Sequence, residues 1–300
     1  MSVQSSRAAD ARSRSRTKER RKRPGNRWLS NGSVVVGGAI VALYLIVLIV
    51  SLVWTPSDPN AIDPVNRLAP TGTPGHLLGT DSLGRDVVSA LLAGAKNSAA
   101  VAAGACGLSV VAGTALGLTA ASLGRTTDEL IMRAMDVCVS IPGVVIALVL
   151  AATIGSGIAS TIFALLFFFT PAFTRMVRAN ALRILAEDFP KVAELYGRSK
   201  PFIAVRHVLP NIFSILLVQA SQYYAVAILT EAGLSYLGVG VNRPEISWGM
   251  MLKEAQQTVG IDSPLAMWPG AAIMVTVLGL NILGDGVRDV LDPKLRRADR

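Results

Sequence analysis

The chain has 300 residues, of which 51% are hydrophobic and only 16% are charged, and its formal net charge is +9. Soluble domains usually carry about a quarter charged residues, so the composition leaves no room for a separate soluble domain of ordinary size. Ten Lys and Arg residues lie within residues 1–27 without interleaved aromatics. This segment is therefore predicted to be a disordered basic tail, and a nucleic-acid partner is not expected.

The first long apolar run is Val34–Trp54. It is longer than the core of a signal peptide and no cleavage pattern follows it, so residues 28–60 are predicted to hold an uncleaved first transmembrane helix. Residues 61–97 are rich in Pro and Gly and are expected to form an external loop. The end of that loop, Leu83–Lys96, is predicted to be a short amphipathic helix on the membrane surface.

Five further transmembrane helices are expected within residues 98–290. They are Ser98–Leu123, two within Val137–Thr174, one from Leu209 to about Glu231, and Pro264–Leu283. The uncharged run Val137–Thr174 is too long for one crossing, so the glycines Gly155 and Gly157 predict a hairpin. Residues 125–136, before this hairpin, are expected to form a short charged loop with helical character.

Lys and Arg predict the orientation, because they concentrate on the cytoplasmic side of membrane proteins. The basic tail, the segment Arg175–His207 and the charged tail 291–300 all carry several such residues. They are therefore placed in the cytoplasm, with both termini inside. The fold class predicted on this basis is an all-α polytopic membrane protein with about six transmembrane helices.

The cytoplasmic segment between the fourth and fifth spans has a distinctive pattern. Asp188–Gly197 is typical of a short amphipathic helix ended by glycine, and Pro210 is expected to open the next membrane helix. Such a helix would lie parallel to the membrane and could bind a partner. Gly197 could equally be no more than a helix C-cap.

This segment resembles the cytoplasmic loop of permease subunits of ATP-binding-cassette (ABC) importers, which carries E-A-A, three residues, Gly and then I-x-L-P. Val192-Ala193, Gly197 and Val208-Leu209-Pro210 fill the equivalent places, with Lys191 where the family has Glu. Five other segments are similar to the C-subunit type of dipeptide/oligopeptide permeases: His76–Asp86, Asp128–Asp136 with Pro142, Glu231–Gly238, Ser247–Gly249 and Gly284–Pro293.

The resemblance implies a type I ABC importer permease fold, in which one chain forms half of a pathway for dipeptides or oligopeptides in the inner membrane of a prokaryote. The implied partners are a second permease subunit in a heterodimer, cytoplasmic ATPases and an external substrate-binding protein. Residues 187–200 would be the coupling helix seated on an ATPase. The residues assigned to coupling are Lys191, Val192, Ala193, Glu194, Leu195, Tyr196, Gly197, Arg198, Leu209 and Pro210.

This chain is not expected to be an enzyme. It has no G-x-x-x-x-G-K-[ST] phosphate loop, so ATP and Mg²⁺ would be bound by the ATPase subunits. Its two cysteines, Cys106 and Cys138, fit neither a zinc site nor a disulfide framework by number or spacing. No catalytic residue, cofactor or metal site is therefore predicted.

Several alternatives stay open. Glu231 either caps a bend at the outer water interface or faces the pathway, since a carboxylate within an apolar run is costly. Asp81, Arg85 and Asp86 either form polar structure in the outer loop or contact substrate. The cargo could instead be nickel or another chelate. An ion-driven secondary transporter is disfavoured, because no repeat is evident and Glu231 is the only clear intramembrane carboxylate.

Overall fold

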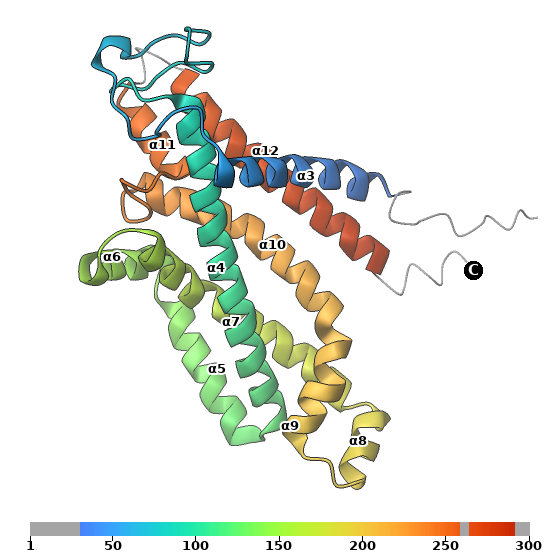
Figure 1. Cartoon of the computed structure of the whole chain (residues 1–300). Coiled ribbons are helices and arrows are strands. Elements are labelled where there is room, and N and C mark those ends of the chain that lie inside the picture. The colour runs from blue at the N-terminus through green and yellow to red at the C-terminus, as the bar shows by residue number, and fades with distance from the viewer. Residues whose placement is uncertain (1–30, 259–263, 292–300) are drawn as a thin grey trace, which may run out of the picture.

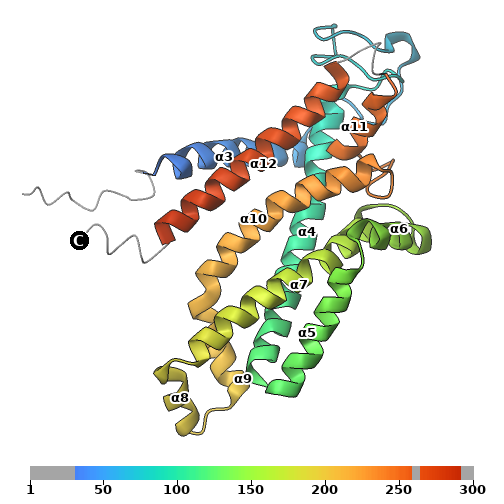
Figure 2. The ribbon, with the colours of Figure 1, turned by 180° about the vertical axis from the view of Figure 1, so that it is seen from behind.

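The computed structural model describes residues 31–258 and 264–291, so the predicted basic tail 1–27 and residues 292–300 of the C-terminal tail lie outside it. The outer loop and α11 lie at one end of the molecule and α8 and α9 at the other, with long helices running between them (Figures 1 and 2). The helices are α3 (Gly32–Val53), α4 (Val87–Ser122), α5 (Arg125–Ser140), α6 (Gly143–Ile154), α7 (Ile158–Leu185), α8 (Asp188–Leu195), α9 (Lys200–Ile203), α10 (Leu209–Tyr236), α11 (Trp248–Gln256) and α12 (Pro264–Leu291), with a 3-10 turn at Pro64–Asn66 and a π segment at Ala204–Val208.

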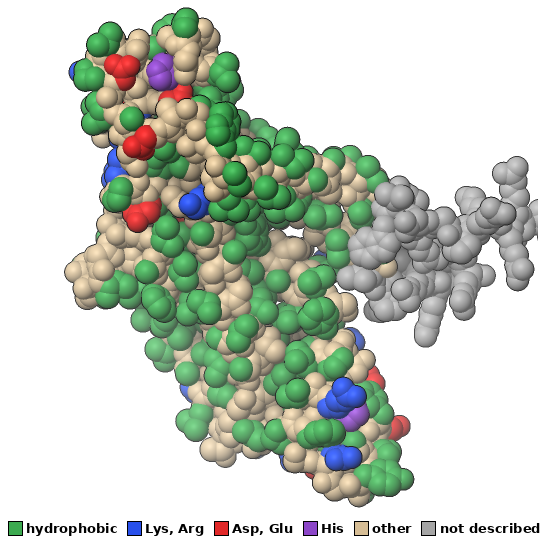
Figure 3. All heavy atoms as spheres, viewed as in Figure 1, with side chains coloured by type: hydrophobic (Ala, Val, Ile, Leu, Met, Phe, Trp, Pro, Cys, Tyr) green, Lys and Arg blue, Asp and Glu red, His purple; other side chains and the backbone are tan. Residues whose placement is uncertain are grey.

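The number of membrane-spanning helices agrees with the prediction. Five helical stretches among the described residues are long and apolar enough to cross a bilayer, and the bent pair α5–α6 brings the total to six if it counts as one span. Charged side chains gather mainly at the two ends of the face drawn in Figure 3, and the surface between them is largely hydrophobic and uncharged. This distribution is expected of a protein whose middle lies in hydrocarbon.

The separate surface helix predicted at Leu83–Lys96 was wrong. Instead, α4 begins at Val87 and runs without a break to Ser122. The Asp86 carboxylate starts it by accepting hydrogen bonds from the backbone N–H and the hydroxyl of Ser89, at 2.8 and 2.7 Å. No Gly or Pro break separates the amphipathic stretch from the apolar one, so a single helix continues out of the membrane and the outer loop ends at Asp86.

The charged loop predicted at 125–136 is also helical. It forms most of α5, which meets α6 at a bend of 83°. The bend lies at Ile141-Pro142, where Ile141 is in an extended conformation and Pro142 cannot supply an N–H to a helix. The predicted break between the third and fourth spans is confirmed, because α6 ends at Gly155 and α7 starts after Gly157, both with positive φ.

Two arginines of α7 hold α5 in place. Arg178 forms a bidentate ion pair with Asp128, and Arg175 donates a hydrogen bond of 2.8 Å to Asp136. These contacts account for the two aspartates of the charged motif noted in the sequence. The helix α7 continues to Leu185, beyond the end of the uncharged run at Thr174.

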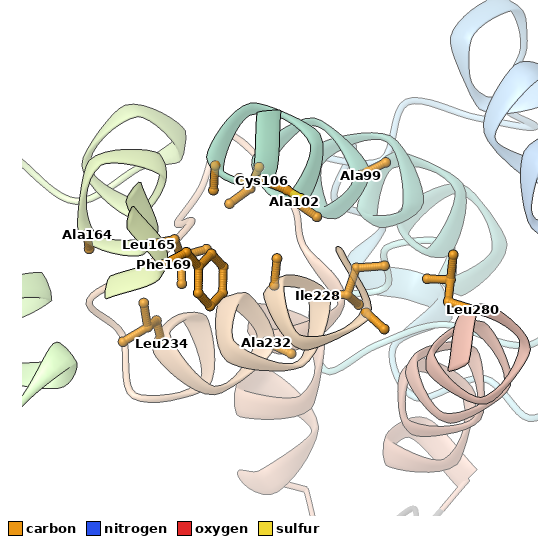
Figure 4. Packing of buried hydrophobic residues seen from close by; sticks show 14 of the residues in the cluster. Ala99, Ala102, Cys106, Ala164, Leu165, Phe169, Ile228, Ala232, Leu234 and Leu280 are labelled. Atoms are coloured by element: carbon orange, nitrogen blue, oxygen red, sulfur yellow. The ribbon is translucent and has the colours of Figure 1, made fainter. Parts of the chain in front are cut away.

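The core lies where α4, α7 and α10 cross (Figure 4). Small residues of α4, including Ala102 and Cys106, lie on the side of that helix toward Phe169 of α7 and Ile228 of α10 (Figure 4). Such small side chains allow helix backbones to approach closely in a membrane, where contact rather than water exclusion stabilises packing. At the edge, α3 lies beside α12 (Figures 1 and 2).

Candidate functional site

The sequence pattern correctly identified a short helix, but α8 covers only Asp188–Leu195, less than the predicted 187–200. Gly197 has φ +77°, and its N–H donates to the carbonyl of Glu194 at 2.9 Å. The N–H of Arg198 donates to the carbonyl of Ala193 at 3.1 Å. This pair of bonds is a Schellman motif, so Gly197 is the C-cap glycine.

The last residues of α8 present large apolar side chains to solvent. Leu195 is 86% exposed and Tyr196 is 83% exposed, and Val192 and Phe189 are also exposed. They lie at the end of the molecule opposite the outer loop, beyond the ends of α7 and α10 (Figures 1 and 2). Exposed apolar side chains grouped on one short helix are suited to contact with another protein.

Lys191 does not disturb this helix. Its ammonium lies 3.3 Å from the Asp188 carboxylate, and both side chains are exposed. An exposed ion pair between residues one turn apart stabilises a helix by about a few tenths of a kcal/mol at most, so Lys191 contributes little to the stability of α8. Glu194 is similarly exposed, with its carboxylate 4.0 Å from the Lys200 ammonium.

Aromatic contacts attach α8 to the start of α10. The ring of His207 lies 6.3 Å from Phe189 and 6.1 Å from Phe202, edge to face in both cases. The Arg198 guanidinium lies over the Phe202 ring at 4.9 Å. The chain on either side of Gly197 thus packs against the same turn of helix, the one that carries His207.

Pro210 lies in the first turn of α10 as predicted, but the helix does not begin afresh there. The helical stretch runs from Lys200 to Tyr236, with Leu209 half-buried and Pro210 exposed at the first two positions of α10. The π segment Ala204–Val208 comes directly before them. Proline removes one helical N–H and crowds the carbonyl four residues earlier, and a widened π turn accommodates it without ending the helix.

Glu231 lies neither at a water interface nor on an open face of this chain. Its side chain is 0% exposed, enclosed between α10, α4 and the start of α11. Ser98 donates a hydrogen bond to one carboxylate oxygen at 2.8 Å, and Ser235 donates to the other at 2.6 Å. Both expectations for Glu231 are corrected, because neighbouring helices rather than water satisfy its oxygens.

Asp81 and Arg85 form polar structure in the outer loop. The Asp81 carboxylate accepts hydrogen bonds from two backbone N–H groups and from Arg85 Nε at 2.6 Å. Arg85 is only 5% exposed and also donates to Glu254 at 3.2 Å. Asp86 is buried, caps α4 and lies 3.0 Å from the His76 ring. None of the three side chains is free for substrate in this chain.

Asp81 and Arg85 form an outer cluster together with Arg243 and Glu254, and neither of the last two was predicted as a site residue. Arg243 forms a two-pronged ion pair with Glu254 at 3.0 and 2.9 Å, and it also bonds Asn60 at 2.5 Å. Burial raises the pKa of Glu254, but the hydrogen bond from Arg243 and the charges of Arg243 and Arg85 outweigh it and lower the pKa below its usual value. Neither Arg243 nor Glu254 lies in a motif noted in the sequence, so no local signal pointed to them.

No group of three or more His, Cys, Asp or Glu side chains able to hold a metal ion occurs within residues 31–258 and 264–291. The sites that these residues do form are an exposed apolar helix tip at one end and an ion-paired cluster at the other. Long membrane helices connect the two. This arrangement defines the chain as a polytopic membrane protein with a polar structure at each end.

Comparison with known proteins identifies the family. Residues 113–297 match the family described as the inner membrane component of binding-protein-dependent transport systems. The chain belongs to this family, and it is therefore a transport component of the inner membrane rather than an enzyme in its own right. The matched residues include α8 and Glu231.

Similar bacterial proteins match nearly the whole chain. The glutathione transport system permease protein GsiD of Pectobacterium atrosepticum is 37% identical over 270 residues, 90% of each chain. A Brucella suis biovar 1 protein, provisionally named a peptide permease, is 37% identical over 276 residues, 91% of this chain and 90% of its own. The dipeptide transport system permease protein DppC of Alkalihalophilus pseudofirmus is 34% identical over 266 residues, 89% and 87% respectively.

Proposed function

We propose that this chain is one permease half of an ATP-driven importer for dipeptides or oligopeptides. It would form half of the translocation pathway with a second, different permease subunit. Two cytoplasmic ATPases would supply the energy by binding ATP and Mg²⁺, and an extracytoplasmic binding protein would deliver the cargo. Both termini would lie in the cytoplasm.

The observation that supports contact with an ATPase is the exposed apolar C-terminal end of α8. Leu195 and Tyr196 are large, apolar and more than four-fifths exposed, at the end of the molecule rich in Lys and Arg. A monomeric chain gains nothing from exposing them to water, whereas a groove on an ATPase would remove both from solvent. The Gly197 cap ends α8 sharply, and the contact between Phe189 and His207 holds the start of α8 in place, so this helix suits the role of a coupling helix.

The relatives' names support the cargo class. Two of them specify dipeptides or peptides and a third specifies glutathione, which is itself a tripeptide derivative. A nickel chelate is the alternative cargo. Uptake of labelled dipeptide into membrane vesicles containing the whole complex and its binding protein, with Ni²⁺ as competitor, distinguishes the two cargo classes.

The experiment for the coupling site replaces Leu195 by aspartate. A charged side chain cannot enter an apolar groove without losing its hydration, so we expect at least a tenfold loss of ATPase subunits from the complex. The tagged chain is solubilised from native membranes and purified, and the ATPases recovered with it are quantified by mass spectrometry.

Val65→Asp is the matched control, because Val65 is 91% exposed and lies in the outer loop at the opposite end. This control should retain the ATPases and should insert in the membrane in the same amount. Equal ATPase recovery from Leu195→Asp and from Val65→Asp would contradict the coupling assignment.

A further inference from the structure

Two motifs noted in the sequence, Glu231–Gly238 and Ser247–Gly249, meet in space although no role has yet been given to either. Glu231 and Ser235 lie one turn apart on α10, and their side chains share a hydrogen bond. Ser247 is the N-cap of α11, where its hydroxyl accepts a hydrogen bond from the backbone N–H of Met250 at 3.2 Å. The backbone N–H of Trp248, the first residue of α11, binds the same Ser98 hydroxyl that binds Glu231, so the start of α11 lies beside the buried carboxylate.

The hydroxyl groups around Glu231 are directed by backbone donors. The backbone N–H of Trp248 donates to the Ser98 hydroxyl at 3.4 Å, and Ser98 in turn donates to Glu231. The backbone N–H of Val241 donates to the Ser235 hydroxyl at 2.9 Å, and Ser235 donates to the other carboxylate oxygen. One carboxylate thus connects α4, α10, the loop after α10 and the start of α11.

The first turn of α11 is closely packed against α4 and α10. The indole N–H of Trp248 donates to the Leu91 carbonyl of α4 at 3.0 Å, and a Cβ at Gly94 would lie only 2.7 Å from the indole ring. On the other side, a Cβ at Gly249 would lie 2.2 Å from the carbonyl oxygen of Ala232. The first turn of α11 is therefore wedged between α4 and α10 and cannot shift without moving one of them.

The helix that carries Glu231 leads to the α8 contact site. His207, which contacts Phe189 of α8, is 24 residues earlier in the same helical stretch, a span of about 36 Å at 1.5 Å per residue. At the outer end, α11 also carries Glu254, to which Arg85 and Arg243 bind. The outer cluster, Glu231 and α8 therefore form one contiguous series of contacts along α10.

From these contacts we infer that Glu231 is a positioning residue, which fixes the outer cluster to α10 so that docking of the binding protein outside is sensed at α8 inside. This inference rests on the proposed function. A carboxylate accepts from both serines at once, which holds α4, α10 and α11 in one arrangement. When the outer cluster moves, α10 has to move with it.

The test uses the complete complex of both permeases, ATPases and binding protein in lipid nanodiscs. The ATPase rate is measured with and without binding protein loaded with dipeptide. In Glu231→Gln, the amide fills the same space but accepts from only one of the two serines, so the other hydroxyl must turn and accept from the amide N–H, and the negative charge is lost. We expect basal ATP hydrolysis within twofold of the wild type and at least a fivefold smaller stimulation by loaded binding protein.

Glu245→Gln is the matched control, since it makes the same chemical change at an exposed residue of the outer loop, and its stimulation should equal that of the wild type. Combining Glu231→Gln with Ser98→Ala should cost no more stimulation than Glu231→Gln alone. An unchanged stimulation, or a basal and a stimulated rate that fall in proportion, would overturn the inference.

If Glu231→Gln does not assemble, Ser98→Ala carries the test, because it removes a single hydroxyl and one of the two bonds to Glu231. A stimulation at least twofold smaller supports the inference, and an unchanged stimulation overturns it. Failure of the proposed function is a separate result, because the wild-type chain would then bring down no ATPase before any variant is made.

Discussion

Glu254 is the side chain on which the charges of the outer cluster converge. It accepts hydrogen bonds from Arg85 and Arg243, which reach it from two different loops. The Arg85 side chain is 6% exposed, so its charge depends on these acidic partners rather than on water. Leaving a buried cation without a partner costs much more folding free energy than the formation of an exposed ion pair contributes.

Replacing Glu254 by glutamine should destabilise the outer cluster by about 2 kcal/mol at neutral pH, below the value for a fully buried pair because Glu254 is partly exposed. The lowered pKa of Glu254 gives the sign of the pH dependence. Its stabilising contribution is complete above the ordinary glutamate pKa of about 4.3 and is lost as the pH falls through the lower folded-state pKa. Thermal unfolding in detergent measures this difference.

The wild type and the Glu254→Gln variant should therefore differ at pH 7 and converge on acidification. Glu245→Gln in the same loop is the control, because Glu245 is exposed. A difference between wild type and Glu254→Gln that stays constant from pH 7 to pH 3 would show that the carboxylate charge is not what stabilises the cluster.

At the scale of elements, the contact between α4 and α7 depends on glycine. A Cβ at Gly113 would lie 2.4 Å from the Cβ of Phe173 and 3.0 Å from the backbone nitrogen of Thr174, whereas Gly107 on the same helix has nothing within 4 Å. The two glycines are equal in helix propensity and differ only in what faces them. Alanine substitutions at these two positions therefore distinguish the effect of helix packing on stability from the effect of helix propensity.

Gly107→Ala should be neutral or stabilise the protein by up to about 1 kcal/mol, because alanine restricts the unfolded chain. Gly113→Ala should instead destabilise it by about 1–3 kcal/mol, since α4 and α7 would have to separate. The melting temperatures of both variants in the same detergent provide the comparison. If Gly113→Ala melts at or above Gly107→Ala, the close approach of α4 and α7 is not required for stability.

At the scale of the whole molecule, the two polar ends must lie on opposite sides of the membrane. The outer cluster with its exposed Val65 is at one end and α8 with its exposed Leu195 is at the other (Figure 1). The bias of Lys and Arg toward the α8 end and the basic tail favours α8 in the cytoplasm.

Cysteine labelling tests this orientation in a chain whose Cys106 and Cys138 are replaced by serine. Val65→Cys should react with a membrane-impermeant maleimide in spheroplasts. Leu195→Cys should react only after the membrane is opened, because its thiol would lie in the cytoplasm. Labelling of Leu195→Cys in sealed spheroplasts, with a cytoplasmic marker protein unlabelled, would reverse the orientation.

The sequence by itself determined the class, the number of membrane spans, the short helix before Gly197 and the family. These features depend on local patterns: apolar runs of bilayer length, a glycine at a helix end and motifs of fixed spacing. Element boundaries were less predictable. Lys96 was assigned to a separate surface helix and Arg178 to the polar cytoplasmic segment, yet both are good helix formers and lie within α4 and α7, which extend beyond the apolar runs.

Only the tertiary structure decided what the buried polar residues do. Glu231 is satisfied by Ser98, which is 133 residues away in the sequence, and Arg85 is satisfied by Glu254, which is 169 residues away. No local pattern contains such pairs, because a buried charge is stabilised by whichever neighbours the folded helices bring to it. Ser98 and Arg243 lie in no motif noted in the sequence, and they became recognisable only once α4, α10 and α11 were packed together.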